Sequence, residues 1–433
     1  SYATRKKNIR IYLLIDEYDN FTNTILSTYG TEFYRKATHG EGFIRGFFNV
    51  IKSATTGTGA ALERLFITGV SPVTMDDVTS GFNIGTNITN DSWFNDLVGF
   101  SENELREMLE YYKEQGVLQE SIDEIVAMMK PNYDNYCFSE DTLEQCMFNS
   151  DMALYFLKSF VLHHKKPKEI VDPNIRTDFN KLAYLIKLDH GLGENFSVIK
   201  EIAEQGEIIT DIVTHFSALE MTDPSNFKSL LFYFGLLSIK GVDMVGRPIL
   251  HVPNLVVREQ LFNFLIQGYI KHDIFKIDMN KMSALFENMA FRGDWKPLFD
   301  FIANAVREQS RIREYIEGEA HIKGFLLAYL GMYRYYQLYP EYELNKGFAD
   351  FFFKPSLSVP VLPPFTYLLE VKYAKAGASE KEIRALADEA REQLLRYSED
   401  ELVAEAKAKG ELKLITIVWR SWELVLLEEV TLS

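Results

Sequence analysis

The residues of this sequence best suited to catalysis lie in its last quarter, where Glu370 and Lys372 stand in the run TYLLEVKYAK. Side chains on a strand alternate between its two faces, so Glu370 and Lys372 should share one face while Val371 points into the core. Asp350 interrupts an earlier apolar run, GFADFFF, and a neighbouring strand can bring it to the same face. The pattern predicts two carboxylates and an ammonium gathered at one place on a sheet.

Metal-assisted cleavage of a phosphodiester is the chemistry that such a group suits. Two close carboxylates raise each other's pKa, and a divalent cation relieves their repulsion. Mg²⁺ favours sites with one or two carboxylates plus water and phosphate oxygens. We therefore expect Asp350 and Glu370 to be ligands of Mg²⁺ or Mn²⁺. The Lys372 ammonium can orient or deprotonate the attacking water and offset charge in the transition state.

Three further residues extend this site. Glu319 precedes the strands on a helix and can act as an outer metal ligand or orient a metal-bound water. Gln393 and Tyr397 are four positions apart on a later helix, hence on one face, where they can contact a phosphate or hold Lys372. The alternative is a solvated Glu-x-Lys pair, which is common by chance. The apolar strands around the carboxylates favour a site, because buried carboxylates must be paired or metal-bound.

This ordered set resembles the PD-(D/E)XK nuclease superfamily. More narrowly, it resembles the C-terminal nuclease-like domain of bacterial proteins that carry an N-terminal AAA-ATPase-like domain. The matching stretches are GFADFFF, TYLLEVKYAK and AREQLLRYS. The resemblance implies that Asp350 and Glu370 are metal ligands, Lys372 the catalytic lysine and Glu319 the helical acid, with nucleic acid as the substrate. The Pro-rich loop at 355–364 is long for the family and leaves the strand register open.

A second landmark, LLIDEYDN, has the form of a Walker B motif. In such motifs the aspartate, here Asp16, holds Mg²⁺, and the glutamate, here Glu17, polarises the water that attacks ATP. The string is similar to the AAA-ATPase-like family named above, as are RLFITGVSPV, LVGFSENEL and PNYDNYCFS. This resemblance places Thr68 where a sensor residue would sit. Asp16, Glu17 and Thr68 are the cofactor-binding residues that it implies.

The phosphate-binding loop of such ATPases is missing from the sequence. No G-x-x-x-x-G-K-[ST] occurs, and the glycine cluster TTGTGAALER follows the Walker B motif and lacks the lysine. Without this loop nothing cradles the phosphates. ATP is therefore expected as a cofactor only if a phosphate loop exists outside this chain. A truncated or degenerate ATPase, a loop upstream of residue 1, and a non-catalytic binding or regulatory protein remain open.

The elements that must position these residues follow from periodicity. The expected fold is α/β and mostly α: a partial P-loop (AAA-like) α/β domain, a helical, winged-helix-like middle and a PD-(D/E)XK-type α/β domain. We expect these domains at 1–165, 166–284 and 285–433. The predicted elements are buried strands at 11–15 and 64–70, a capping-box helix after Ser101, a helix at 176–189, a hairpin before 253, one long helix over 313–339, strands at 342–346, 348–353, 366–373, 412–419 and 423–428, and helices at 379–397 and 398–409.

Amino-acid composition indicates which class of protein this chain belongs to. The 433 residues are 47% hydrophobic and 25% charged, which is typical of a globular chain of two or three domains. A net charge of −16 argues against a protein that coats nucleic acid without specificity, but not against a nuclease. Two cysteines fit neither a disulfide framework nor a zinc site. With no signal peptide and no long apolar run, the sequence predicts a cytoplasmic protein without membrane contact. It leaves the oligomeric state open.

Overall fold

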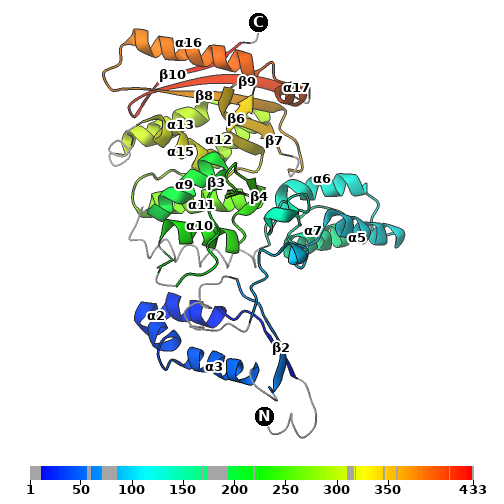
Figure 1. Ribbon diagram of the computed structural model, residues 1–433. Coiled ribbons are helices and arrows are strands. Elements are labelled where there is room, and N and C mark those ends of the chain that lie inside the picture. Colours follow the sequence, from blue (N-terminus) through cyan, green and yellow to red (C-terminus); the bar gives the residue numbers. More distant parts are fainter. Residues whose placement is uncertain are drawn as a thin grey trace. The chain divides into compact units, whose positions relative to one another are not determined.

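The computed structural model describes residues 11–55, 60–70, 85–167, 170–172, 194–217, 220–221, 223–309, 316, 318–344, 347–356, 359–408 and 410–431. They group into two compact units, residues 1–198 with 207–254, and residues 199–206 with 255–433. Figure 1 shows the elements of each unit along the chain. The three domain boundaries expected from the sequence stay predictions, and the helix expected at 176–189 lies outside the described residues.

The N-terminal part of the first unit is a parallel pair of strands covered by helices. Strand β1 (Ile11–Ile15) pairs with β2 (Leu62–Ile67), and helices α2 (Asn20–Thr38) and α3 (Phe43–Thr55) follow β1 (Figure 1). Ile44, Phe48 and Ile51 of α3 form the core against one face of these strands.

The expectation that both strands are buried is wrong for the described residues. Leu14 is 74% exposed, and Tyr12 and Phe66 are also exposed. Parallel strands are buried when elements cover both faces of their sheet. Here the described helices cover the face that carries Leu13 and Ile15, and the alternate side chains lie open.

Helices dominate the next part of the first unit. After the short η1 (Ser92–Phe94) come α5 (Glu102–Glu114), α6 (Ile122–Tyr133), η2 (Glu140–Thr142) and α7 (Ser150–His163). The capping box at Ser101 is confirmed: Glu104 N donates to Ser101 Oγ at 3.2 Å, and Ser101 N donates to Glu104 Oε2 at 2.8 Å. Such caps stabilise a helix start by about 1 kcal/mol.

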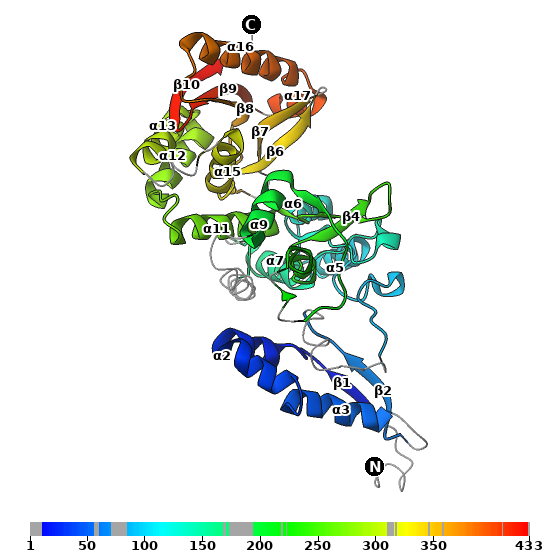
Figure 2. The same cartoon turned by 60° about the vertical axis from the view of Figure 1, so that its left-hand side comes forward.

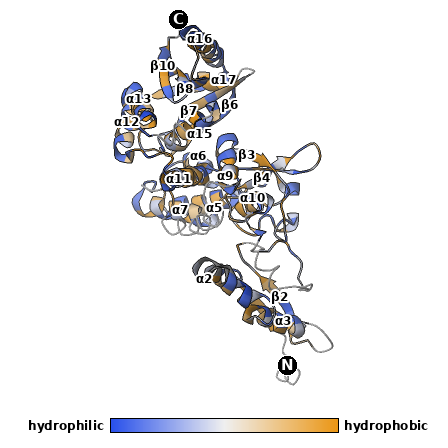
Figure 3. Ribbon diagram, turned by 90° about the vertical axis from the view of Figure 1, so that its left-hand side faces the viewer, coloured by the Kyte–Doolittle hydropathy of each residue, from blue (hydrophilic) through white to orange (hydrophobic). Residues whose placement is uncertain are grey.

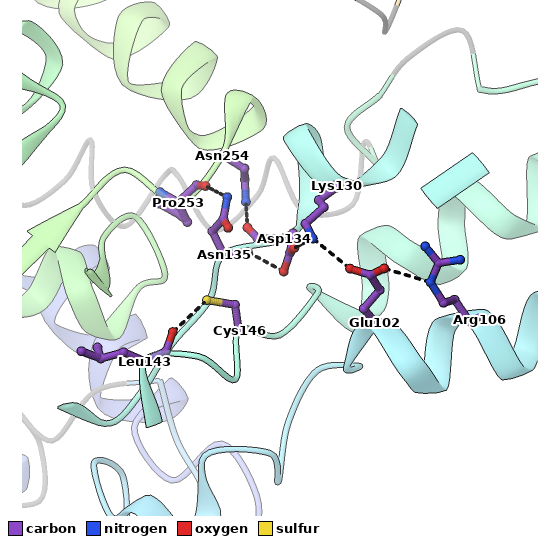
Figure 4. A network of polar contacts seen from close by, with 9 residues as sticks. All are labelled: Glu102, Arg106, Lys130, Asp134, Asn135, Leu143, Cys146, Pro253 and Asn254. Atoms are coloured by element: carbon purple, nitrogen blue, oxygen red, sulfur yellow. Dashed lines mark hydrogen bonds and ion pairs between the residues drawn. The ribbon is translucent and has the colours of Figure 1, made fainter. Parts of the chain in front are cut away.

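A polar network fixes the segment that follows α6 (Figure 4). Asn135 Nδ2 donates to the carbonyl of Pro253 at 2.9 Å, and Asn254 Nδ2 donates to the carbonyl of Asp134 at 3.1 Å. Nearby, Glu102 accepts hydrogen bonds of 2.8 Å from both Arg106 and Lys130. Side-chain amides here satisfy backbone groups of a turn that belongs to neither helix nor sheet.

The helix–hairpin–helix order expected for the middle of the chain is present. Its elements are α9 (Glu194–Gln205), β3 (Glu207–Ile209), α10 (Pro224–Tyr233), β4 (Ser238–Val242), β5 (Pro248–His251) and α11 (Leu255–Lys271). The three strands form a sheet in the order β3-β5-β4, and both pairings are antiparallel. The hairpin expected before residue 253 is confirmed as β4 and β5, and the winged-helix-like character of this region stays a prediction.

The second unit is built on a five-stranded mixed sheet in the order β10-β9-β8-β7-β6. Its strands are β6 (Tyr336–Leu344), β7 (Gly347–Pro355), β8 (Phe365–Ala374), β9 (Glu411–Arg420) and β10 (Glu423–Val430). Strands β8 and β9 are parallel, and the other neighbours are antiparallel. Two helices lie in the crossover that connects the parallel pair.

Helices cover both faces of this sheet. Figures 1 and 2 show α16 (Glu380–Tyr397) on one side, and α12 (Met279–Arg292), α13 (Lys296–Glu308) and α15 (Glu319–Leu330) on the other. The short α17 (Glu401–Lys407) follows α16. The strands carry the hydrophobic colour in Figure 3, whereas α16 is mainly hydrophilic and buries one stripe that includes Ala390 and Leu394.

The single long helix expected over 313–339 is wrong. Helix α15 ends at Leu330, the chain turns after Gly331, and strand β6 begins at Tyr336. Gly331 packs so closely that a Cβ there would lie 2.2 Å from the Phe262 ring. The first four residues of β6, 336–339, alternate between buried and half-buried positions, which is the strand period, and tyrosine favours strands. Among the described residues, no helix is long and apolar enough to cross a membrane.

Candidate functional site

The site begins where the ladder between β7 and β8 opens. The two strands pair from Phe353 and Tyr367 to Phe351 and Leu369, and one more step places Asp350 opposite Glu370. From this point, carboxylate side chains accept hydrogen bonds from backbone N–H groups in place of backbone carbonyls. Asp350 Oδ2 accepts from the backbone N–H of Val371 at 2.6 Å, and Glu370 Oε1 accepts from the N–H of Asp350 at 3.3 Å. Two carboxylates therefore lie between the strands, at 5% and 1% exposure.

Lys372 lies beside Glu370, as the alternation of strand side chains predicts. Its Nζ is 3.4 Å from Glu370 Oε2 and 3.5 Å from Glu389 Oε1 on α16. The Lys372 side chain is 14% exposed, and α16 places Glu389 beside its ammonium. Sequence reasoning located this pair correctly, and it did not identify Glu389.

A second lysine, Lys323, was missed by the sequence reasoning and lies at the centre of the acidic group. Its Nζ is 2.9 Å from Glu319 and 2.9 Å from Glu341, and it is also bonded to Asp350 Oδ1. Glu341 lies opposite Asp350 on β6, between the pairs Pro340–Phe351 and Tyr342–Ala349. Glu319 therefore joins the site through Lys323. One feature of the sequence could have indicated Lys323: it lies four residues after Glu319 on an apolar helix, a spacing that brings two side chains together.

The charges of this group shift one another's pKa. Burial raises the pKa of Glu370 to about 8, the nearby Asp350 charge adds to the shift, and Lys372 opposes it. Burial also raises the pKa of Asp350 against the pull of Lys323. For Lys323 and Lys372 burial disfavours the ammonium, but the surrounding carboxylates outweigh it and raise both pKa values. Burial therefore favours the neutral form of the two carboxyls, while both lysines stay charged.

Comparison with known families identifies both ends of the chain. Residues 317–429 match the family of the PD-(D/E)XK nuclease superfamily, and residues 1–79 match a family described as predicted AAA-ATPase. The C-terminal sheet is a PD-(D/E)XK nuclease domain. Its match runs from α15 into β10, and includes Asp350, Glu370 and Lys372. No curated protein matches the chain. Both family resemblances drawn from the sequence are confirmed. For the ATPase-like family the match covers LLIDEYDN and RLFITGVSPV, and the likeness of LVGFSENEL and PNYDNYCFS stays a prediction.

Gln393 and Tyr397 both lie on α16 of the nuclease domain. Tyr397 belongs to the core cluster with Leu368 and Leu394, and a Cβ at Gly347 would lie 2.4 Å from its hydroxyl. The Gln393 side-chain oxygen is buried without a hydrogen-bond partner among the described residues. Tyr397 therefore packs against the start of β7, the strand that carries Asp350. Contact of either residue with a phosphate stays a prediction.

The donor set of the nuclease domain suits a hard cation that keeps water ligands. Within the described ranges, no group of three or more His, Cys, Asp or Glu side chains is arranged to hold a metal. Asp350 and Glu370 place carboxylate oxygens side by side, and their role as metal ligands stays a prediction. The buried Thr416 hydroxyl, in register with Glu370 on β9, has no hydrogen-bond partner in the part of the chain described. Mg²⁺ typically uses one or two carboxylates and several waters. The residues therefore fit Mg²⁺ or Mn²⁺ better than a metal that needs a complete protein cage.

The three residues predicted to bind a cofactor in the ATPase-like region, Asp16, Glu17 and Thr68, also lie close together. The Thr68 hydroxyl donates to Asp16 Oδ1, and Thr68 N donates to the carbonyl of Ile15 at 2.8 Å. Glu17 has a positive φ of 50°, and its carboxylate accepts from Asn20 Nδ2 at 2.8 Å. The three residues lie at the carboxyl ends of β1 and β2, where open α/β sheets bind ligands. Nucleotide binding by them stays a prediction.

Proposed function

We propose that the C-terminal domain is a metal-dependent nuclease that hydrolyses phosphodiester bonds in DNA or RNA. One observation carries the proposal: Asp350 and Glu370 are inserted between β7 and β8 in place of backbone hydrogen bonds, with the Lys372 ammonium 3.4 Å from Glu370. Two adjacent buried carboxylates repel each other even beside lysine ammoniums, and a divalent cation would relieve this repulsion. A purely structural pair of strands would gain nothing from placing both carboxylates there.

Each residue has a role that its position supports. Asp350 and Glu370 would hold Mg²⁺ or Mn²⁺ through their carboxylate oxygens, and the bound ion would polarise a phosphoryl oxygen and acidify water. Lys372 would orient the attacking water through its ammonium and offset charge that develops on the phosphate. Glu319 and Glu389 would hold Lys323 and Lys372 in place from α15 and α16.

Cleavage of labelled single- and double-stranded DNA and RNA by the full chain tests this function. Wild type should cut at least one substrate with Mg²⁺ or Mn²⁺ and not with EDTA, and Lys372→Met should lose at least about 100-fold in rate. Lys375→Met is the matched control, since Lys375 is an exposed lysine beyond the end of β8. Equal rates in wild type and Lys372→Met, or no cleavage by wild type, would overturn the proposal.

A second function, nucleotide binding by the ATPase-like domain, is favoured by the placement of Thr68 against Asp16. We infer that these residues would bind Mg²⁺ and ATP only with a phosphate loop supplied from outside residues 1–433, because the sequence contains no G-x-x-x-x-G-K-[ST]. Titration of the chain with a fluorescent ATP analogue tests this inference. Tight binding by the chain alone would contradict it.

A further inference from the structure

Lys323 lies on an apolar helix, yet its ammonium contacts three carboxylates. Its ammonium meets Glu319, Glu341 and Asp350, which come from α15, β6 and β7. The Lys323 side chain is only 18% exposed. A single surface ion pair contributes little to stability, but three carboxylates that converge on one sheltered ammonium form a built site.

The helix that carries Lys323 packs closely against α9 and the sheet. A Cβ at the neighbouring Gly324 would lie 3.0 Å from the ends of the Lys200 and Glu204 side chains of α9. The contacts of the Lys323 ammonium with Glu319, Glu341 and Asp350 place it beside Asp350. The fold therefore supplies one positive charge where the proposed metal ligand is.

The two oxygens of Asp350 are both engaged in this arrangement. Oδ1 is bonded to Lys323 and Oδ2 accepts from the N–H of Val371. A divalent cation bound through Oδ1 would lie next to the Lys323 ammonium, and like charges a few ångströms apart repel strongly in a sheltered site. The ammonium and the cation thus compete for the same oxygen.

We propose that Lys323 is an internal counter-ion that occupies the cation position beside Asp350 in the metal-free protein and is displaced from Asp350 when a divalent cation binds. The inference rests on the proposed function, because it takes Asp350 to be a metal ligand. Glu319 and Glu341 give the displaced ammonium partners that it already contacts at 2.9 Å. Lys323 would lower the metal affinity of the site and stabilise the fold without metal.

These two effects have opposite signs, and this separates the proposal from a purely structural role. Removal of the charge should weaken the metal-free fold, because Asp350 loses its nearest cation, and should strengthen metal binding. A lysine that only held the helix in place would weaken both when replaced.

Calorimetric titration of the full chain with Mn²⁺ tests the proposal in wild type and Lys323→Met. We expect Lys323→Met to bind Mn²⁺ at least about tenfold more tightly and to melt at a lower temperature in EDTA. Lys296→Met is the matched control, since Lys296 pairs with Asp300 on the exposed side of α13, and its Mn²⁺ affinity should equal that of wild type. Lys323→Arg keeps the charge, so it should not bind more tightly than wild type.

The outcomes distinguish this inference from the proposed function. If wild type binds Mn²⁺ through Glu370 but folded Lys323→Met binds no more tightly, only the Lys323 inference is overturned. If Lys323→Met alone binds Mn²⁺, the inference stands and the native chain is not a metal-dependent nuclease. If neither binds, both are overturned. Should Lys323→Met fail to fold, Lys323→Gln replaces it with the same expected gain in affinity.

Discussion

Replacement of Glu370 by Gln should remove most of the pH dependence of stability of the metal-free second unit. Burial, with the Asp350 charge, raises the pKa of Glu370 from 4.5 to about 8. A carboxyl with a raised pKa binds its proton more tightly in the folded state. Its stabilising contribution is present at low pH and is lost as the pH rises through the folded pKa. Metal-free wild type should therefore become less stable between about pH 5 and about pH 9.

The size of this effect follows from the shift. One pKa unit corresponds to about 1.4 kcal/mol, so the change from 4.5 to about 8 gives at most about 5 kcal/mol. Of this, about 4 kcal/mol would be lost between about pH 5 and about pH 9. Because Glu370 titrates together with Asp350, we expect a loss of about 2–4 kcal/mol in the free energy of unfolding. Gln cannot ionise, so Glu370→Gln should show little of this loss.

Urea unfolding in EDTA, followed by tryptophan fluorescence, measures the effect. Of the four tryptophans, Trp295, Trp419 and Trp422 lie in the second unit, so a Trp93→Phe background makes the signal specific to it. The matched control is Glu392→Gln at an exposed position of α16, which should keep the wild-type pH profile. A Glu370→Gln variant as pH-dependent as wild type would refute the reasoning that burial protonates this carboxyl.

Substitutions at three further positions test packing and capping in the nuclease domain. Gly347→Ala should lower the free energy of unfolding by about 1–3 kcal/mol, because its Cβ would lie 2.4 Å from the Tyr397 hydroxyl. Thermal melting measures this loss of stability. An unchanged melting temperature would contradict the close packing. Thr416→Val should change stability by less than about 1 kcal/mol or increase it, since the buried hydroxyl has no hydrogen-bond partner among the described residues. A large loss of stability in urea unfolding would show that the hydroxyl is bonded. Ser379→Ala should cost about 1 kcal/mol by removing the capping box of α16, while Ser379→Asp should retain most of the stability.

Much of the site could be predicted from the sequence because its residues interrupt apolar runs. Asp350 and Glu370 are charged positions within β7 and β8, and strand alternation places Lys372 beside Glu370. The resemblance to a nuclease family added the order of these motifs along the chain. The register between Asp350 and Glu370 could not be predicted, because it depends on how the Pro-rich loop between the strands closes.

The contacts of Lys323 were beyond sequence reasoning for a physical reason. They depend on Glu341, whose position follows from the start of β6 at Tyr336. The tyrosines before Glu341 fit a helical pattern as well as a strand pattern, and the sequence reading extended the helix through them. A helix there would have carried Glu341 away from Asp350. The exposed face of β1 was missed similarly, because periodicity shows that residues are apolar and not what covers them.

Binding of Mn²⁺ to the full chain, with and without the two carboxylates between β7 and β8, is the most direct test of the account. Calorimetry should show binding by wild type and by the surface control Glu392→Gln. The same titration should show that Asp350→Asn and Glu370→Gln each lose most of this affinity, because each removes one of the two buried ligands. Mn²⁺ binding that is unaffected by both substitutions, or absent from wild type, would contradict the claim that this site is a metal centre.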